Sequence, residues 1–225
     1  MTDLHTHILP GMDDGAKDVQ QSLTLLQMEK QQGVDTVVLT PHFYRQKEPV
    51  ERFLARRNKA MEALQAALPL DSPKLILGAE VAWYPTILQE KDLDKLCLGN
   101  SGYILLELPN AAWGKYLVEQ IQNFAKNSGL KPILAHIERY LPLQRPKQVA
   151  QLLNLGLPMQ MSTDALVRLL SRKRMLKFLA QGKWYLGSDC HNTVKRKPSM
   201  DRAVQYLKKH LADADIETMI NWDEQ

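Results

Sequence analysis

The chain has 225 residues, 44% of them hydrophobic, which is enough for one domain with a substantial core, so we expect a single domain over residues 1–225. Two cysteines are too few for a disulfide framework, the first residues form no basic and apolar leader, and no apolar stretch approaches the roughly 20 residues of a membrane helix, so we expect a cytoplasmic protein without membrane insertion. The formal net charge of +4 is mild, and the basic clusters at 168–177 and 195–197 lack interleaved aromatic residues, which excludes an evident nucleic-acid partner.

Short apolar runs that stop at a polar residue recur along the chain and predict strands buried on both faces. In chain order these strands are expected over 2–7, 36–42, 74–80, 103–109, 131–138, 157–161 and 184–191. Segments with helical spacing are expected over 17–32, 50–67, 114–128, 145–155, 164–181 and 199–210. Gly33 and Gly129 stand near the ends of the first and third helices, where glycine often ends a helix. The alternation predicts an α/β fold of parallel strands joined by right-handed crossovers, close to the eight strands of a full barrel.

Histidines and acidic residues gather at the ends of these predicted strands. Only six histidines occur in the chain, and five of them, together with three acids, stand at such positions: His5, His7, His42, Glu80, Glu107, His136, Asp189 and His191. The carboxyl ends of the strands of a parallel α/β barrel open onto one face, so these side chains converge although they are far apart in sequence. Imidazole and carboxylate groups are common ligands of divalent metals. The pattern therefore predicts a metal-dependent hydrolase.

Spacing within the chain strengthens this interpretation. His5 and His7 are two residues apart, so on one strand they face the same side and can hold one ion together, and Asp189 and His191 repeat that geometry. Glu80 could bridge two ions, as could Glu107, because a carboxylate offers an oxygen to each. One histidine alone at a strand end is more often a hydrogen-bonded loop residue; the joint occurrence favours a metal centre.

The loop after the first strand leaves alternatives open. Asp14 could reach a third ion, orient a histidine, or cap the helix that begins near Ala16, and Asp13 could serve equally well as the cap. His210 lies on a late amphipathic helix and is expected at the surface.

At these residues the chain resembles the polymerase and histidinol phosphatase (PHP) superfamily. Within it the chain is most similar to the bacterial PHP-type protein-tyrosine phosphatases that act beside capsule and exopolysaccharide tyrosine kinases. The matching blocks are DLHTHILPGMDDGAK at 3–17, TPHF at 40–43, LGAEV at 77–81, ILLELP at 104–109, LAHIERY at 134–140 and GSDCHN at 187–192. They span nearly the whole chain in order, and HILPGMDDGA is specific to the subfamily.

The resemblance implies a distorted (β/α)7 barrel of the PHP type with three divalent ions, most commonly Mn²⁺, with Fe, Zn, Co or Mg as other candidates. A hydroxide bridging the ions would attack the phosphorus of phosphotyrosine, and the substrate would be the tyrosine-rich tail of a partner kinase. The implied ligands are His5, His7, Asp14, His42, Glu80, Glu107, His136, Asp189 and His191. Arg139 and Arg196 stand where the family places residues that grip phosphate, although Arg196 could instead be part of an exposed basic loop.

Some residues depart from the family pattern or have two interpretations. The chain reads HIER at 136–139 where the family usually has HPER, and its segment 160–166 lacks the usual polar and glycine-rich pattern, which leaves the substrate rim open. Phe43, Tyr44 and Tyr140 could line a slot for a phenyl ring or pack in the core.

Three other functions compete with this one. Cys190 and Arg196 are spaced as in cysteine-dependent tyrosine phosphatases, but the intervening HNTVK has no glycine for a phosphate cradle, and Cys190 should point away from its flanking ligands. The same metals could act on a small phosphate ester such as histidinol phosphate. A metal-stabilised adaptor would require a closed structural metal site. Such sites usually have four ligands, fewer than the nine candidates in this chain. The sequence does not determine the oligomeric state.

Overall fold

The computed structural model describes residues 1–222, so the last three residues of the predicted domain lie outside the described residues. All paired strands are parallel, as predicted. One sheet has the order β1-β2-β4 and the other has the order β3-β5-β6-β7-β8-β9. Their bounds are β1 Thr2–Thr6, β2 Thr36–Leu39, β3 His42–Phe43, β4 Lys74–Leu77, β5 Glu80–Ala82, β6 Tyr103–Glu107, β7 Lys131–Leu134, β8 Met159–Ser162 and β9 Trp184–Gly187.

Two predicted strands, 36–42 and 74–80, are each broken into two. The first breaks between β2 and β3 at Pro41, which has no N–H to donate to a ladder, and the second breaks between β4 and β5 at Gly78. The breaks lie side by side, because the N–H of Gly78 donates to Leu39 (2.9 Å) and the N–H of Glu80 donates to Pro41 (3.1 Å). Both segments of the chain thus leave the first sheet at the same place. They pair again in the second sheet as β3 and β5, with His42 opposite Glu80.

The first and last strands meet at their carboxyl ends. The N–H of Asp189 donates to the carbonyl of His5 at 2.7 Å, and the N–H of His7 donates to the carbonyl of Cys190 at 2.9 Å. A parallel bridge joins Thr6 to Cys190. These bonds place the residues that follow β9 directly beside the end of β1.

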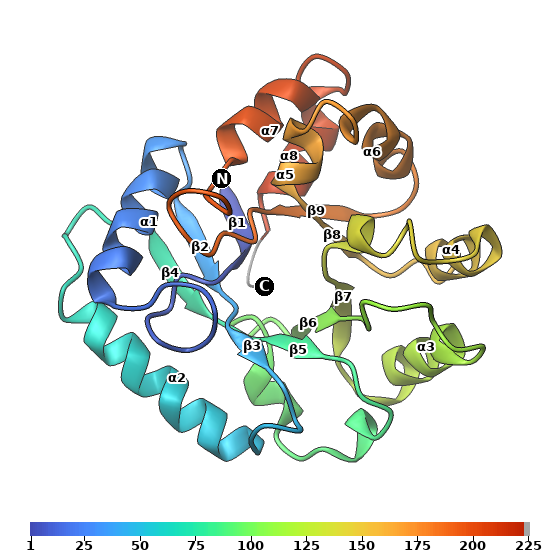
Figure 1. The fold of residues 1–225 in the computed structure, drawn as a ribbon, viewed down its shortest axis with the longest axis horizontal. Coiled ribbons are helices and arrows are strands. Elements are labelled where there is room, and N and C mark those ends of the chain that lie inside the picture. The colour runs from blue at the N-terminus through green and yellow to red at the C-terminus, as the bar shows by residue number, and fades with distance from the viewer. Residues whose placement is uncertain (223–225) are drawn as a thin grey trace.

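The helices lie around the outside of the strands (Figure 1). Their bounds are α1 Val19–Gln31, α2 Val50–Gln65, α3 Leu117–Asn127, α4 Pro146–Leu153, α5 Thr163–Val167, α6 Arg172–Leu179, α7 Met200–Leu207 and α8 Asp213–Ile220. Short 3₁₀ turns cover η1 Ile87–Gln89, η2 Leu93–Leu96 and η3 Ile137–Arg139. The predicted helix 164–181 is wrong as one element, because the hydroxyl of Ser171 donates to the carbonyl of Ala165 (2.6 Å) and ends the first helix locally. Helix α8 was not predicted.

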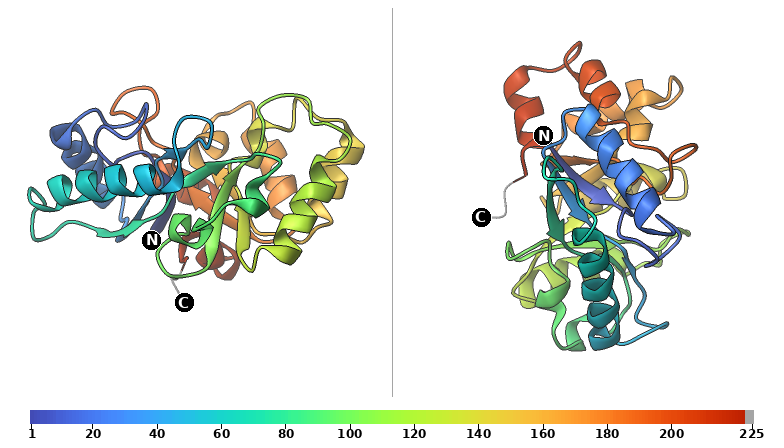
Figure 2. Two further views of the ribbon diagram at one scale, coloured as in Figure 1. Left: turned by 90° about the horizontal axis from the view of Figure 1, so that it is seen from below. Right: turned by 90° about the vertical axis from the view of Figure 1, so that its left-hand side faces the viewer.

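A small apolar cluster fills the space enclosed by the strands. It takes one buried residue from each of six strands, namely Leu4, Val38, Ile76, Leu105, Ile133 and Tyr185, and includes Trp222. The hydroxyl of Thr2 donates to the carbonyl of Trp222 at 3.3 Å, so the two ends of the described chain lie close together (Figure 2). The larger core lies between strands and helices. Within residues 1–222 no helix is long and apolar enough to cross a membrane.

Candidate metal centre

The predicted ligands converge at the carboxyl ends of the strands. His5 lies in β1, His42 and Glu80 are paired residues of β3 and β5, and Glu107 ends β6. The others follow β1, β7 and β9 within a few residues: His7, His136, Asp189 and His191. Asp14 reaches the same place from the loop after β1, with a carboxylate oxygen 3.4 Å from Nε2 of His191 and 3.6 Å from Nε2 of His42.

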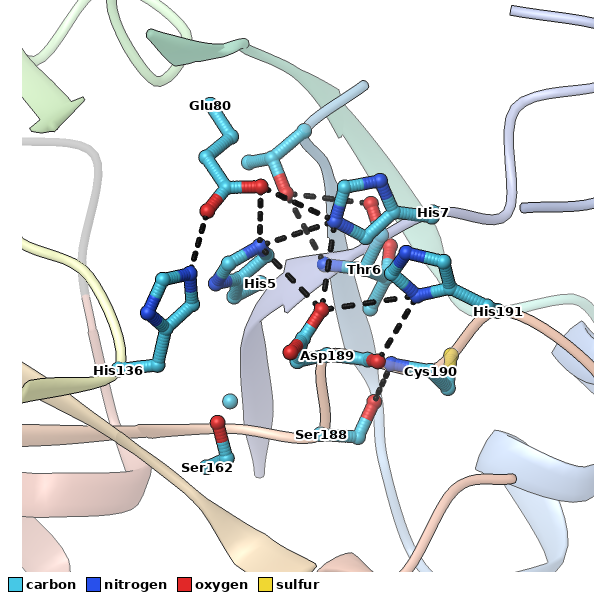
Figure 3. A network of polar contacts seen from close by, with 12 residues as sticks. His5, Thr6, His7, Glu80, His136, Ser162, Ser188, Asp189, Cys190 and His191 are labelled. Carbon is cyan, nitrogen blue, oxygen red and sulfur yellow. Dashed lines mark hydrogen bonds and ion pairs between the residues drawn. The ribbon is translucent and has the colours of Figure 1, made fainter. Parts of the chain in front are cut away.

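The buried carboxylate of Glu80 contacts several imidazoles of this group, among them those of His5, His7 and His136 (Figure 3). Its Oε2 lies 3.1 Å from Nε2 of His5 and 3.2 Å from Nε2 of His7. The same oxygen lies 3.0 Å from Nδ1 of His42. Its Oε1 lies 2.7 Å from Nε2 of His136. The two oxygens therefore face different imidazoles, which is the arrangement expected of a bridging carboxylate.

The donor atoms fit divalent metal ions. Oε2 of Glu80 and Nδ1 of His42 are buried and lie 3.0 Å apart without the geometry of a hydrogen bond, although such atoms are costly to leave unsatisfied. Two ligand atoms about 3 Å apart suit neighbouring positions around an ion with bonds of about 2.1 Å. Three overlapping groups bring their ligand atoms within 4.8 Å of one another: His7, Asp14, His42 and His191; His5, His7 and Glu80; and His42, Glu80 and Glu107.

Asp13 orients His7, a role that the sequence analysis offered to Asp14. Its Oδ2 lies 2.7 Å from Nδ1 of His7 and accepts the backbone N–H of His42 at 2.9 Å. Neither Asp13 nor Asp14 caps α1; Asp18 does, accepting the N–H of Gln21 at 2.8 Å. The spacing of Asp18 and Gln21 is a capping signal that could have been found in the sequence.

Gln160 is a site residue that the sequence analysis missed. This fully buried side chain lies in β8, and its Oε1 is 3.1 Å from Nδ1 of His5 and accepts the N–H of His136 at 2.7 Å. With its Nδ1 held by Gln160, His5 has Nε2 as the nitrogen available to a metal ion. A glutamine in the middle of an otherwise apolar strand was the available signal.

Electrostatics distinguish His7 from His136 and His191. Burial alone would lower the pKa of His7, but the negative charge of Asp13 and its hydrogen bond raise it to about 9. Burial lowers the pKa of His136 to about 4. Burial and the positive charge of His7 lower the pKa of His191 to about 2. Against the opposing effect of burial, the charge of His5 and the hydrogen bond with His136 hold the pKa of Glu80 well below its usual range. The carboxylate of Glu80 therefore stays ionised, and its negative charge favours bound cations.

Two predicted ligands have left-handed backbone conformations. His136 has φ of 28° and Asp189 has φ of 52°. Such values are uncommon for residues other than glycine, and they concentrate at functional sites where surrounding contacts enforce them.

Both predicted arginines reach the edge of the centre. Arg139 pairs with Oδ2 of Asp189, and Nη2 of Arg196 donates to Oδ1 of the same carboxylate at 2.8 Å. The loop that carries Arg196 is ordered by Asn192, whose side-chain oxygen accepts backbone N–H groups of residues 194, 195 and 196. Arg196 is thus held at the site, rather than being part of a solvated basic loop.

The aromatic residues near the ligands separate into core and rim. Phe43 and Tyr140 are buried, and the hydroxyl of Tyr140 accepts the N–H of Leu108 at 3.0 Å. Tyr44 is half-buried, and its ring centroid lies 5.0 Å from that of His42. Of these three residues, Tyr44 is the one that is partly exposed beside a predicted ligand.

Cys190 points away from the ligands, as its position between them predicts. Its Sγ lies 3.7 Å from Oε1 of Glu29 in α1, at the edge of the network in Figure 3. Complete burial, with the negative charge of Glu29 second, holds the pKa of the thiol well above its usual range. A thiolate nucleophile is disfavoured here because deprotonation would create an uncompensated buried charge. His210 is exposed, as predicted.

Known proteins are similar to this chain along nearly its whole length. A family model described as capsular polysaccharide synthesis, CpsB/CapC, matches residues 1–224. The chain belongs to the CpsB/CapC family. The resemblance to bacterial PHP-type tyrosine phosphatases inferred from the sequence blocks is confirmed by this match.

Named tyrosine-protein phosphatases are similar to most of the chain. The tyrosine-protein phosphatase YwqE of Bacillus subtilis is 30% identical over 93% of this chain and 84% of its own length. The tyrosine-protein phosphatase CpsB of Streptococcus agalactiae is 26% identical over 92% of this chain and 89% of its own length.

Solved structures agree with the family assignment. A structure described as a metal-dependent tyrosine phosphatase, from work on YwqE of B. subtilis and CpsB of Streptococcus pneumoniae, matches with a TM-score of 0.79 and 25% identity over 97% of this chain and 91% of that chain. The phosphotriesterase homology protein of Escherichia coli matches with a TM-score of 0.52 at 9% identity, over 97% of this chain and 94% of that chain, which shows a shared fold alone.

Proposed function

We propose that this chain is a metal-dependent protein-tyrosine phosphatase. The observation that carries the proposal is the carboxylate of Glu80 placed between four imidazoles, with two arginines at the edge of the same group. Hydrolysis of phosphate esters needs cations close to the phosphoryl oxygens and donors that orient them, and this site contains groups of both kinds.

The metals would be held by the nine predicted ligands. The three overlapping groups of ligand atoms support a centre of three divalent ions, and the mixture of imidazole and carboxylate suits Mn²⁺ among other divalent metals. The ring of seven strand positions, closed by the bonds between β1 and the residues after β9, supports a distorted (β/α)7 barrel. We further propose that the protein acts in the cytoplasm on the phosphorylated tail of a tyrosine kinase for capsule or exopolysaccharide synthesis, a partner drawn from the family's role.

The residues of the chain would bind and orient the phosphoryl group. When bound, the ions would supply positive charge to its oxygens and lower the pKa of water. Arg139 and Arg196 both have guanidinium groups beside Asp189, so each can turn its remaining N–H groups toward a phosphate oxygen. Asp13 and Gln160 fix the orientation of His7 and His5.

The leaving group explains why no strong acid is needed. Phenol has a pKa of about 10, so the phenolate of tyrosine leaves more readily than an alkoxide. Tyr44 can contact the substrate ring. Burial and nearby carboxylates, Glu107 first among them, raise the pKa of its hydroxyl above the usual range, so Tyr44 stays neutral.

The test is hydrolysis of a phosphotyrosine peptide by protein treated with chelator and then resupplied with Mn²⁺. Parallel samples carry Cys190→Ala, and histidinol phosphate serves as a second substrate. We expect activity to be lost with chelator, restored by metal, retained by Cys190→Ala, and greater for the peptide.

Two other outcomes would overturn different parts of the proposal. Activity that survives chelation and disappears in Cys190→Ala would overturn the metal mechanism. A preference for histidinol phosphate would keep the metal centre and overturn the substrate.

A further inference from the structure

A groove of about 830 Å³ opens directly beside the metal centre. Its inner wall includes Arg139, Asp189 and Arg196, so it is continuous with the proposed phosphate position. Its outer wall is built from α5, α6 and the segment 168–171 that joins them. The volume is in the range of pockets that hold drug-sized ligands, and it exceeds what the phosphoryl group alone needs.

The charges along the groove do not balance. Its acidic residues already have partners: Asp164 pairs with Arg168 at 2.6 Å, Asp189 pairs with both site arginines, and Glu138 accepts the N–H of Ser162 at 3.3 Å. Three exposed cations also line the groove, and within residues 1–222 none of them forms an ion pair with a carboxylate: Arg174, Lys195 and Lys197. The groove therefore presents uncompensated positive charge around its rim.

The same groove exposes large apolar side chains. Leu169 and Leu170 lie between α5 and α6 and are both exposed, while Leu141 and Met175 form a buried apolar floor. Exposed leucines that rim a functional pocket are typical of surfaces that bind another protein. The break between α5 and α6 creates this surface, since one continuous helix would not present the segment 168–171 as a loop.

We propose that this groove binds the acidic and apolar residues that flank the phosphotyrosine of a protein substrate. The inference rests on the proposed phosphatase function and specifies its substrate class. Positive rim charge complements acidic residues, the exposed leucines complement apolar ones, and continuity with Arg139 and Arg196 lets one peptide occupy both the groove and the metal centre. The segment 160–166, which departs from the usual family pattern, contributes Ser162, Asp164 and Ala165 to this wall.

The decisive variant is Arg174→Glu, because Arg174 lines the groove and contacts none of the proposed ligands. Its matched control is Lys173→Glu, an equal change of charge at the neighbouring exposed residue of α6, which does not line the groove. The substrates are a phosphotyrosine peptide with Asp, Glu and Leu beside the phosphotyrosine, the same peptide with Asn and Gln in place of the acids, and free phosphotyrosine. Anisotropy of the fluorescently labelled acidic peptide with chelator-treated protein measures binding without catalysis.

We expect Arg174→Glu to lower kcat/KM for the acidic peptide by at least about fivefold and to weaken its binding in the anisotropy measurement similarly. Free phosphotyrosine should be hydrolysed unchanged, and Lys173→Glu should behave as the unmodified chain. Equal kinetics and equal peptide binding for both variants would overturn the role proposed for the groove and leave the phosphatase function intact. Failure of the unmodified chain to hydrolyse any phosphotyrosine substrate would overturn the proposed phosphatase function. The anisotropy comparison would still show whether the groove binds the acidic peptide. If Arg174→Glu instead weakens only the binding of anionic phospholipid vesicles, the groove recognises a membrane and the proposal is wrong.

Discussion

Nε2 of His136 lies 2.7 Å from Oε1 of Glu80, although the two residues are 56 positions apart in the chain. The contact joins the end of β7 to the start of β5 across the intervening β6. Because Oε2 of the same carboxylate faces three further imidazoles, Glu80 connects the two halves of the ligand set.

Glu80→Gln should therefore abolish most of the activity. The substitution keeps the shape of the side chain but replaces one charged oxygen with an NH₂ group, which cannot coordinate a cation. We expect bound metal to fall and kcat to decrease by at least about a hundredfold, as measured by elemental analysis and steady-state kinetics. Glu119→Gln, on the exposed face of α3, serves as the control and should change neither quantity. Full metal content in Glu80→Gln would contradict the bridging role.

Asp13 and Asp18 should have separable effects. Asp13→Asn weakens the acceptor that orients His7, so metal affinity should fall by about 10- to 100-fold in a competition assay with a chelating dye. Asp18→Ala removes the N-cap of α1, which should lower the free energy of unfolding by about 1 kcal/mol in urea and leave metal affinity unchanged. Interchanged effects would show that the roles assigned to the two residues are wrong.

The stability of metal-free protein should decrease as pH rises. The folded-state pKa of His7 is about 9, above its ordinary value of 6.5, so the folded state binds the extra proton between these two values. The raised pKa of His7 contributes on the order of 3 kcal/mol to the free energy of unfolding. This contribution is fully present below pH 6.5 and is lost as pH rises through 9.

Urea denaturation of chelator-treated protein at pH 6.5 and pH 9 measures this loss. His7→Gln should reduce the difference between the two pH values. Metal-loaded protein should show the opposite trend, since a metal requires the neutral imidazole. Equal stability of the metal-free chain at both pH values would contradict the ion pair of His7 with Asp13.

Gly187→Ala should disturb the metal centre through its contact with His5. A Cβ at this position would lie 2.7 Å from Cβ of His5 and 2.9 Å from its backbone nitrogen, so β1 and β9 would have to separate. We expect a loss of about 1–3 kcal/mol in the free energy of unfolding, together with weaker metal binding. At Gly114 an added Cβ would meet no atom within 4 Å, and Gly114→Ala should change neither. Equal behaviour of the two variants would contradict the close approach of the strands.

Most strands and helices of the fold could be predicted from the sequence, but the breaks within three of the predicted elements could not. Strand positions and parallel pairing are visible in the sequence because buried parallel strands are apolar along their whole length. The breaks at Pro41 and Gly78 were missed, because an apolar run does not show where two neighbouring strands bend together. The division of 164–181 into α5 and α6 was missed because it depends on the local hydrogen bond of Ser171.

The sequence by itself determined which side chains stand at strand ends, and hence which histidines, acids and arginines could meet. That information is local, since it depends on periodicity and on where each apolar run stops. The tertiary structure decided their roles: Asp13 rather than Asp14 orients His7, Gln160 supports His5 and His136, and Cys190 faces Glu29. These assignments depend on distances between atoms of different strands and helices, which only the packing of the whole chain fixes.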